Sequence, residues 1–409
     1  MLGEELLGLS PQKPLGADEA SALVASSIGR LESCGACIDF SLAGGVATGT
    51  FFSRDDGRSS AVASLASLPL DEDIVVAIGA FDGVHRGHRA LLARAAKEAD
   101  TRGARFVAVT FSPDPAAVLG GVDESDLLCA AERWQWIQSA GVDDVCVLHF
   151  TPELASLDYE RFVREVLCGM GRLRAIVVGS DFCLGKGGKG TVEALSKLGA
   201  TLGVISSNGA AQANDEGHQA QGGFDVIGMD LAGSDGRPIT ATRIRGLLRE
   251  GKVEAAAFLL GRCHFVRGSV SHGRGEGTAF GFPTANVEVA PGLLVPAEGV
   301  YAGFVVLNGT DCDSRGRATC IAYPAAINVG KPPTFAPGQT GARFLEATLL
   351  GFSGDLYGSS VSVVFCRWLR VSRPFDSLDE LERTVLGNIE WTRRTLGGQA
   401  IDLGEGEAS

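Results

Sequence analysis

The chain lacks a long uncharged apolar run, so no bilayer-spanning helix is expected. Its first residues, MLGEE, hold no basic stretch before an apolar one, which argues against a secretory signal. The chain also lacks an excess of positive charge, because 49 acidic against 36 basic residues give a formal net charge of −13. That balance argues against general binding to nucleic acid or to a membrane surface. We expect a cytoplasmic protein that meets anionic ligands with local positive groups.

The ten cysteines lack the spacing of a metal site or a disulfide framework. Cys34 and Cys37 form a single C-x-x-C, with no second pair and no thioredoxin-like context. Cys146 and Cys366 lie in apolar runs, which is typical of small buried side chains. The pattern favours buried structural cysteines over redox or metal chemistry.

The composition is that of an ordinary globular protein, with 45% hydrophobic and 21% charged residues. A length of 409 residues suffices for two or three domains with sizeable cores. Residues 1–73 show little pattern beyond a helix around 17–31, and we leave them as an unassigned N-terminal extension. Residues 397–409 form a short tail.

Short apolar runs alternate with helical patterns between residues 74 and 262. The predicted strands are 74–78, 105–111, 145–150 and 175–179, and the predicted helices are 87–102, 130–140 and 158–167. This alternation predicts a doubly wound parallel sheet, with ligands at the carboxyl ends of its strands. Residues 206–223 interrupt it with small and polar residues, and we interpret them as a surface insertion.

Residues 74–92, IVVAIGAFDGVHRGHRALL, read as a buried strand, a glycine turn and a helix start. Gly79 and Gly83 permit a tight turn and a close approach of a ligand to the backbone. His85 and His88 share one face of the first helical turn, where unpaired N–H groups attract phosphate. Their imidazoles are suited to donate to the α-phosphate of a nucleotide. A metal site or a packed histidine pair is the alternative, although no Cys or carboxylate completes a ligand set nearby.

Two later segments offer further phosphate ligands. Residues 179–190, GSDFCLGKGGKG, follow an apolar strand but lack the Lys-Ser/Thr pair of a P-loop, so they wrap a triphosphate or form a flexible turn. Thr240 is a candidate N-cap of the next helix. Thr242, Arg243 and Arg245 then place hydroxyl and guanidinium donors at a helix N-terminus, where they suit a leaving pyrophosphate. A surface salt-bridge helix explains the same residues equally well.

After residue 262 the pattern changes to alternating strands separated by turns. The predicted strands are 265–271, 300–307, 318–329, 343–350 and 360–370. They predict a small antiparallel β-barrel. Ser377 and Glu380 form a capping box, and an apolar stripe through Leu381, Val385 and Ile389 predicts a closing helix.

The barrel segment carries its own candidate chemistry. Residues 272–277, HGRGEG, form a glycine-rich loop able to fold over phosphates, and GFPTAN follows at 281–286. Thr284 and Asn286 are two apart, so in an extended segment both side chains point the same way. Their hydroxyl and amide oxygens suit a phosphate-bound Mg²⁺. Glu346 is a charge in an apolar strand and a candidate general base, although an isolated strand Glu more often simply faces outward.

Together these motifs resemble the bacterial bifunctional riboflavin kinase/FMN adenylyltransferase family, also called FAD synthetase, over about residues 74–395. FDGVHRGH, VGSDFCLG and TATRIR match the adenylyltransferase half in order, and GFPTAN, PAEGVYAG, NVGKPPTF, LEATLLGFSGDLYG and LRVSRPFDSLDEL match the kinase half. The resemblance implies a Rossmann-like nucleotidyltransferase domain with a parallel sheet over 74–262. A small antiparallel β-barrel riboflavin kinase domain with a C-terminal helix would follow over 263–396.

The resemblance implies two consecutive ATP-dependent reactions, riboflavin to FMN and then FMN to FAD with release of pyrophosphate. In the kinase half Glu346 would deprotonate the ribityl 5′-hydroxyl, while Thr284 and Asn286 would hold Mg·ATP. In the other half His85 and His88 would stabilise the α-phosphate under attack by FMN. Positioning and electrostatics would suffice for both steps, with no covalent enzyme intermediate.

The resemblance also implies binding roles for further residues. Thr242 and Arg245 would hold the β- and γ-phosphates, and Asp181 would lie beside the adenosine or the flavin. The remaining ATP- or phosphate-binding residues would be Gly79, Phe81, Gly83, Gly273, Gly277 and Pro283. Mg²⁺ with ATP is the expected cofactor, and ATP, riboflavin and FMN are the expected partners. Nucleic acid and membrane are not expected, and a homo-oligomer is left open.

Several positions depart from the family pattern. Asp114 stands where the family usually has the histidine of Pro-His-Pro, which puts negative charge near an anion site. Ala241 replaces a hydroxyl residue and removes one phosphate donor. Thr348, Ser372 and Thr278 replace a common histidine, a common acidic residue and an often basic residue. Losing one donor to a transition state costs roughly a hundredfold in rate or more.

Three interpretations follow from the motifs and the departures. The first is a working two-step FAD synthetase. The second is a riboflavin kinase whose adenylyltransferase half is weak or inactive. The third is a flavin- or nucleotide-sensing module without turnover, against which the intact HRGH motif and the intact Thr284, Asn286 and Glu346 argue.

Overall fold

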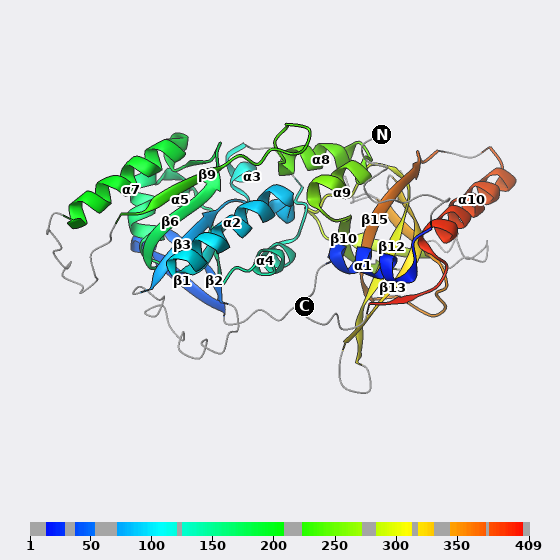
Figure 1. Cartoon of the computed structure of the whole chain (residues 1–409). Coiled ribbons are helices and arrows are strands. Elements are labelled where there is room, and N and C mark those ends of the chain that lie inside the picture. The colour runs from blue at the N-terminus through cyan, green and yellow to red at the C-terminus, as the bar shows by residue number, and fades with distance from the viewer. Residues whose placement is uncertain are drawn as a thin grey trace. The chain divides into compact units, whose positions relative to one another are not determined.

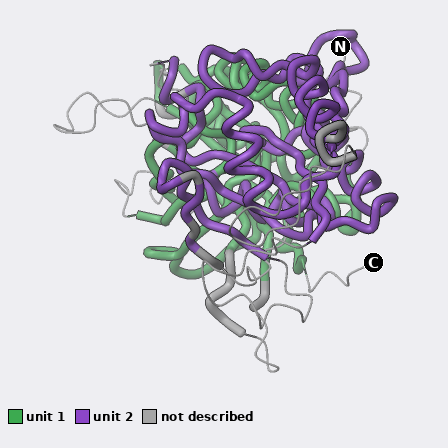
Figure 2. The backbone as a smooth tube through the Cα atoms, turned by 90° about the vertical axis from the view of Figure 1, so that its left-hand side faces the viewer, with its two compact units in different colours: residues 1–30, 125–128, 240–409 green, residues 31–124, 129–239 purple. Residues whose placement is uncertain are grey.

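The computed structural model divides the chain into two compact units, shown in different colours in Figure 2. The sheet unit comprises residues 31–124 and 129–239, and the barrel unit comprises residues 1–30, 125–128 and 240–409. The residues that the structure describes are 14–28, 37–53, 72–120, 125–207, 223–271, 284–312, 318–330, 344–373 and 376–403. The chain passes from one unit to the other after residues 30, 124, 128 and 239.

The sheet unit is built on a seven-stranded sheet with the order β1-β2-β5-β4-β3-β6-β9 (Figure 1). Its parallel strands are β3 (Asp73–Ile78), β4 (Arg105–Ser112), β5 (Asp144–His149), β6 (Arg172–Gly179) and β9 (Asp225–Met229). In β3, the side chains from Ile74 to Ile78 are at most 1% exposed, as expected for a strand covered on both faces. The predicted parallel sheet is confirmed, whereas the half-exposed strand β9 was not predicted.

Helix α2 (Arg86–Arg102) packs on β3, β4 and β6 and ends at Gly103, which adopts a positive φ of 59°. The other helices of this unit are α3 (Pro115–Gly120), α4 (Ala130–Gln138), α5 (Pro152–Ser156), α6 (Tyr159–Arg161) and α7 (Val192–Ser207). The helix predicted over 158–167 is only partly α-helical. Its second half is a π-helix, Phe162–Leu167, in which the Cys168 N–H bonds the Val163 carbonyl five residues back.

Part of the N-terminal extension belongs to this sheet. Strands β1 (Cys37–Leu42) and β2 (Ala47–Ser53) form a hairpin, and β2 pairs antiparallel with β5. Phe51 is 4% exposed within the sheet core, and the Phe52 ring lies 4.5 Å from that of Trp134. The extension, for which the sequence offered no role, therefore completes one edge of the sheet.

The barrel unit contains a second seven-stranded sheet, with the order β12-β15-β10-β11-β14-β13-β16. An additional pairing of β12 with β13 closes six of these strands into the predicted antiparallel barrel. The strands are β10 (His264–Ser271), β11 (Thr284–Val289), β12 (Gly299–Cys312), β13 (Ala318–Gly330), β14 (Phe344–Leu349), β15 (Ser360–Arg370) and β16 (Ile401–Asp402). Tyr301, Phe304 and Phe365 are fully buried in its core.

Four of the helices that the structure describes belong to the barrel unit. Helix α10 (Leu378–Leu396) packs on β12 and β13, and its N-cap Ser377 accepts the Glu380 N–H at 3.2 Å, as predicted. Helices α8 (Ala241–Arg249) and α9 (Val253–Leu260) pack on each other, and α9 also packs on β10 and β15. The fourth helix is α1, and none of the described helices combines the length and the apolar character that a bilayer crossing requires.

Helix α1 (Ala17–Ile28) also belongs to the N-terminal extension, and it packs on β10, β15 and β16. The Ser27 Oγ accepts a hydrogen bond from the Cys263 N–H at 3.2 Å. The Leu15 N–H donates to the Thr395 carbonyl at 2.9 Å. The extension thus supplies a helix to the barrel unit and a hairpin to the sheet unit.

We expect Phe51→Ala to lower the free energy of unfolding of the sheet unit by about 3–5 kcal/mol, because it empties a core position. Thr50→Ala on the same strand is the control. Among the described residues, the Thr50 hydroxyl bonds Asp39 alone, and this bond is exposed to solvent. Losing the hydroxyl should therefore lower the free energy of unfolding by less than about 0.5 kcal/mol. Urea unfolding followed by circular dichroism measures both. Equal effects of the two substitutions would mean that the hairpin does not stabilise the sheet.

His264 is a buried polar residue of the barrel. Its side chain is 3% exposed, and its Nε2–H donates to the Leu294 carbonyl at 2.8 Å. Burial lowers the pKa of His264 from 6.5 to about 4, an effect that the bond to Leu294 partly opposes and the nearby Arg262 reinforces. The imidazole is therefore neutral in the folded protein near pH 7.

Between pH 6.5 and about 4, the unfolded chain binds a proton at His264 that the folded chain excludes. The free energy of unfolding of the barrel unit should therefore fall as the pH drops through this window, by about 3 kcal/mol from this residue. His264→Gln keeps an N–H donor but does not titrate, so its stability should depend less on pH. Chemical unfolding at several pH values tests this, and identical pH slopes for both proteins would contradict it.

Candidate active sites

The first candidate site lies at the carboxyl ends of β3 and β6. The register that pairs Ala77 with Val177 places Gly79 level with Gly179 at this edge. In the loop that follows, Phe81 and Val84 adopt positive φ values of 51° and 36°, which are uncommon for non-glycine residues and indicate strain. The Phe81 ring is fully buried and lies 3.3 Å from where a Cβ of Gly79 would be. The predicted tight turn is therefore present.

Gly83 carries a positive φ of 72°, and the loop then ends at His85, the N-cap of helix α2. The His85 Nδ1 accepts the His88 backbone N–H at 3.2 Å. Because Nδ1 is an acceptor in this bond, the proton of the neutral imidazole must sit on Nε2. The two imidazole rings stack with centroids 3.6 Å apart, so the predicted pairing of the histidines at the helix start is observed.

His88 is held in its neutral form. Burial lowers its pKa well below 6.5, and the neighbouring His85 and Arg133 lower it further. Its Nδ1 is buried and has no hydrogen-bond partner among the described residues, while the Phe81 ring packs edge-on at 5.2 Å. At neutral pH the imidazole can thus donate one hydrogen bond without carrying charge.

Arg133 is a site residue that the sequence did not reveal. It lies on α4, is 4% exposed, and its Nη1 donates to the carbonyls of Ala80 at 3.4 Å and Phe111 at 3.5 Å. A buried guanidinium thus stands where β3 and β4 end, close enough to His88 to lower its pKa. The only signal in the sequence was a charge within the helical stretch AERWQWIQ.

Asp181 belongs to the same edge of the sheet. A Cβ on Gly179 would lie 2.9 Å from the Asp181 Oδ1 and 3.8 Å from Leu231. A Cβ on Gly87 would lie 3.2 Å from the His85 ring and 3.4 Å from Leu231. Leu231 therefore neighbours both segments, and the structure brings Asp181 to the site that holds the histidines.

Asp114, the main departure from the family pattern, has a local role. Its Oδ1 accepts the Ala116 N–H at 2.9 Å, at the start of α3. A carboxylate at a helix N-terminus is stabilised by the unpaired N–H groups there. This use of the negative charge gives a structural reason for an aspartate at this position.

The predicted pyrophosphate residues lie on α8. Thr240 caps this helix by accepting the Arg243 N–H at 3.1 Å, as predicted, and Thr242 is exposed in its first turn. Arg245 is 3% exposed, and its Nε donates to the Ser125 carbonyl at 3.0 Å. Because α8 belongs to the barrel unit, a phosphate site that joins Thr242 and Arg245 to the histidines stays a prediction.

The second candidate site lies on three neighbouring strands of the barrel. Asn286 on β11 pairs with Glu346 on β14, and Glu346 in turn pairs with Asn328 on β13. Directly opposed residues of antiparallel strands point to the same face, so these three side chains form one row. All three are partly buried, and among the described residues Glu346 has no hydrogen bond or ion pair.

The neighbouring positions confirm which face this is. Ala285, Ala347 and Ile327, one residue before or after each member of the row, are at most 4% exposed and face the core. Thr284 lies on the face of the row, opposite Thr348. Thr284, Asn286 and Glu346 are therefore brought together as predicted. Gly273, Gly277, Thr278 and Pro283 lie outside the described residues.

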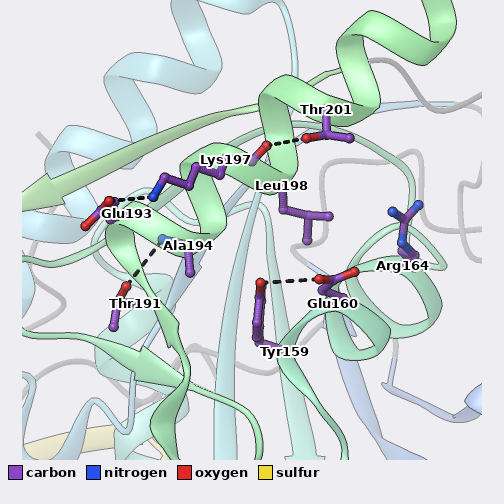
Figure 3. Close-up of a pocket in the computed structure, with 9 residues that line it drawn as sticks. All are labelled: Tyr159, Glu160, Arg164, Thr191, Glu193, Ala194, Lys197, Leu198 and Thr201. Carbon is purple, nitrogen blue, oxygen red and sulfur yellow. Dashed lines mark hydrogen bonds and ion pairs between the residues drawn. The ribbon is translucent and has the colours of Figure 1, made fainter.

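A cavity of about 380 Å³ lies elsewhere in the sheet unit (Figure 3). It is lined by Tyr159, Glu160, Arg164, Thr191, Glu193, Ala194, Lys197, Leu198 and Thr201. The Tyr159 hydroxyl donates to Glu160 at 3.3 Å, and the exposed Lys197 and Glu193 form an ion pair at 2.6 Å. None of the predicted site residues lines it, so we do not assign it to either site.

Two family models match the chain. The model described as FAD synthetase matches residues 68–220, and the model described as riboflavin kinase matches residues 260–396. The bifunctional riboflavin kinase/FMN adenylyltransferase of Bacillus subtilis is 30% identical over 318 residues, which is 76% of this chain and 89% of that relative. The protein of the same name from Escherichia coli K12 is 31% identical, over 79% of this chain and 92% of the relative.

One solved structure has a similar fold along most of the chain. It carries the name macrolide-efflux protein from Streptococcus pneumoniae and is 30% identical, with a TM-score of 0.64. The match covers 79% of this chain and 94% of that structure. The name, including the efflux activity it states, belongs to that structure and is not transferred to this chain.

The fold and the family models define an ATP-dependent flavin transferase with a nucleotidyltransferase domain and a kinase domain. More particularly, the chain belongs to the family of bifunctional riboflavin kinase/FMN adenylyltransferases.

We expect Gly87→Ala to lower adenylyltransferase activity severalfold, because the new Cβ, 3.2 Å from the His85 ring, would push that ring aside slightly. The loss should stay below the roughly hundredfold that a misplacement of about 1 Å costs. Gly387→Ala in α10 is the matched control, since its Cβ would meet no atom within 4 Å. FAD formation from FMN and ATP is the measurement. Full activity in Gly87→Ala would show that the position of His85 is not critical.

Proposed function

We propose that the chain makes FAD from riboflavin in two steps, with Glu346 as the base of the kinase reaction and the His85 and His88 loop as the adenylyltransferase site, in a cytoplasmic enzyme. The observation that carries the proposal is the row in which Glu346, without a partner among the described residues, stands between Asn286 and Asn328. A carboxylate beside neutral amides is free to accept a proton from a substrate alcohol.

In the kinase step, the ribityl 5′-oxygen attacks the γ-phosphorus of ATP while its proton passes to Glu346. The new oxygen–phosphorus bond forms as the bond between the γ-phosphorus and the bridging oxygen breaks, which gives FMN and ADP. Glu346 lies directly opposite Asn286, so the base adjoins the residue predicted to bind the nucleotide. The protein's part in this step is to position the alcohol and to accept its proton.

The residues present fit Mg²⁺ bound to ATP. Thr284 and Asn286 offer neutral oxygens on one face of β11, and no group of three or more His, Cys, Asp or Glu residues within the described ranges could hold a metal by itself. This suits an ion that takes most of its ligands from substrate phosphates and water. When bound, the ion would neutralise charge on the β- and γ-phosphates.

In the adenylyltransferase step, an oxygen of the FMN phosphate attacks the α-phosphorus of a second ATP, and pyrophosphate leaves. Because the His85 Nδ1 is occupied by the helix cap, the Nε2–H is the ring donor that would face the α-phosphate. His88 adds a second neutral donor, and the positive end of the α2 dipole lies at the same place. These donors stabilise the charge that develops around the α-phosphorus.

Flavin products tell the two sites apart. We expect wild type with riboflavin, ATP and Mg²⁺ to form FMN and then FAD, as measured by chromatography over time. Glu346→Gln keeps the shape of the side chain but loses the base, so riboflavin should remain unphosphorylated while added FMN is still converted to FAD. His85→Ala should stop at FMN, with a loss of roughly a hundredfold or more in the second step.

A riboflavin kinase with a weak adenylyltransferase half is the second candidate, favoured by Asp114 and Ala241. Wild type that accumulates FMN without FAD would establish it. The cap that Asp114 forms on α3 weighs against it, because the added carboxylate already has a partner.

A further inference from the structure

Asn328 lies beside the proposed base but has no assigned role. On β13 it pairs with Glu346 of β14 on one side and with Val300 of β12 on the other. Its Oδ1 is buried and has no hydrogen-bond partner among the described residues. Strand pairing thus fixes the position of Asn328 at the proposed kinase site, where its Oδ1 accepts no hydrogen bond from the described residues.

A buried amide oxygen without a donor is costly, and buried polar groups in folded proteins are almost always hydrogen-bonded. The side chains opposite Asn328 in the row offer it no donor, because a carboxylate such as that of Glu346 accepts hydrogen bonds and Val300 has an apolar side chain. ATP phosphates are likewise acceptors. No described neighbour of the row supplies this donor, and a ligand that carries hydroxyl or N–H groups would.

The order of the row indicates which ligand this is. Asn286, the predicted nucleotide-side residue, and Asn328 flank Glu346 on opposite strands, and neighbouring strands lie about 4.8 Å apart. The acceptor alcohol must present its reacting hydroxyl to Glu346 from the side away from the nucleotide. Asn328 lies on that side.

We propose that the Asn328 Oδ1 accepts a hydrogen bond from a ribityl hydroxyl of riboflavin next to the reacting 5′-hydroxyl, and so turns the 5′-hydroxyl toward Glu346. Asn328 is then a substrate-binding residue of the kinase reaction, a role that rests on the proposed function of this site. The neutral amide suits the task, because it accepts from an alcohol without adding charge beside Glu346.

Riboflavin binding without ATP tests the proposal independently of turnover. Quenching of flavin fluorescence gives the Kd, and riboflavin analogues that lack the 2′-, 3′- or 4′-hydroxyl identify the donor. Wild type should bind one analogue roughly tenfold to a hundredfold more weakly than riboflavin, because that analogue leaves the amide unpaired. Asn328→Ala should bind riboflavin as weakly as wild type binds that analogue, and should no longer distinguish the two ligands.

Asn328→Asp keeps an oxygen acceptor at the same place and should retain the discrimination between riboflavin and that analogue. Conversion of FMN to FAD by each variant shows that the sheet unit is intact, and urea unfolding followed by circular dichroism shows that the barrel unit is folded. Unchanged riboflavin affinity in Asn328→Ala would overturn the proposal. An Asn328→Ala variant in which only the KM for Mg·ATP is raised would also overturn it, because Asn328 would then be a metal ligand. A wild type that binds riboflavin with this discrimination but does not phosphorylate it would instead refute the kinase function.

Discussion

One hydrogen bond, from the His88 backbone N–H to the His85 Nδ1, both caps helix α2 and sets the orientation of the His85 ring at the proposed adenylyltransferase site. It begins α2 at the end of a loop whose backbone is strained at Phe81 and Val84, and an N-cap of this kind stabilises a helix by about 1 kcal/mol. The same bond leaves the proton on Nε2. The start of the helix and the direction of the donor therefore depend on a single protonation state.

In the barrel, backbone pairing between strands positions the side chains of the candidate site, where the sheet unit uses a helix cap. Asn286, Glu346 and Asn328 come from three different strands, and their alignment follows from antiparallel register alone. A shift of one residue in any of these pairings would turn the side chain toward the core. The tightly packed row of Ala285, Ala347 and Ile327 on the other face holds the register. Core packing thus determines the geometry of the kinase site.

Much of this was predictable from the sequence, because it depends on local pattern. Apolar runs such as 74–78 predicted the parallel strands, and the two-residue spacing of Thr284 and Asn286 predicted a shared face. Arg133 and Asn328 were not found, since their roles depend on which strand ends a helix reaches and on which residues oppose each other across strands. The β1–β2 hairpin was missed because its strands mix apolar residues with Ser, Thr and Gly in no clear alternation, and because its place in the sheet depends on the distant pairing of β2 with β5.

The boundaries of the two compact units do not coincide with those of the segments that the two family models match. The models match two consecutive segments, yet the barrel unit also takes helix α1 and residues 125–128, which lie before and within the first segment. Residue 126 is built into this unit through bonds with Gly292 and Leu294. The segments that the two family models match are consecutive in the sequence, whereas the two compact units are interleaved along the chain. No single cut in the chain therefore separates one complete unit from the other.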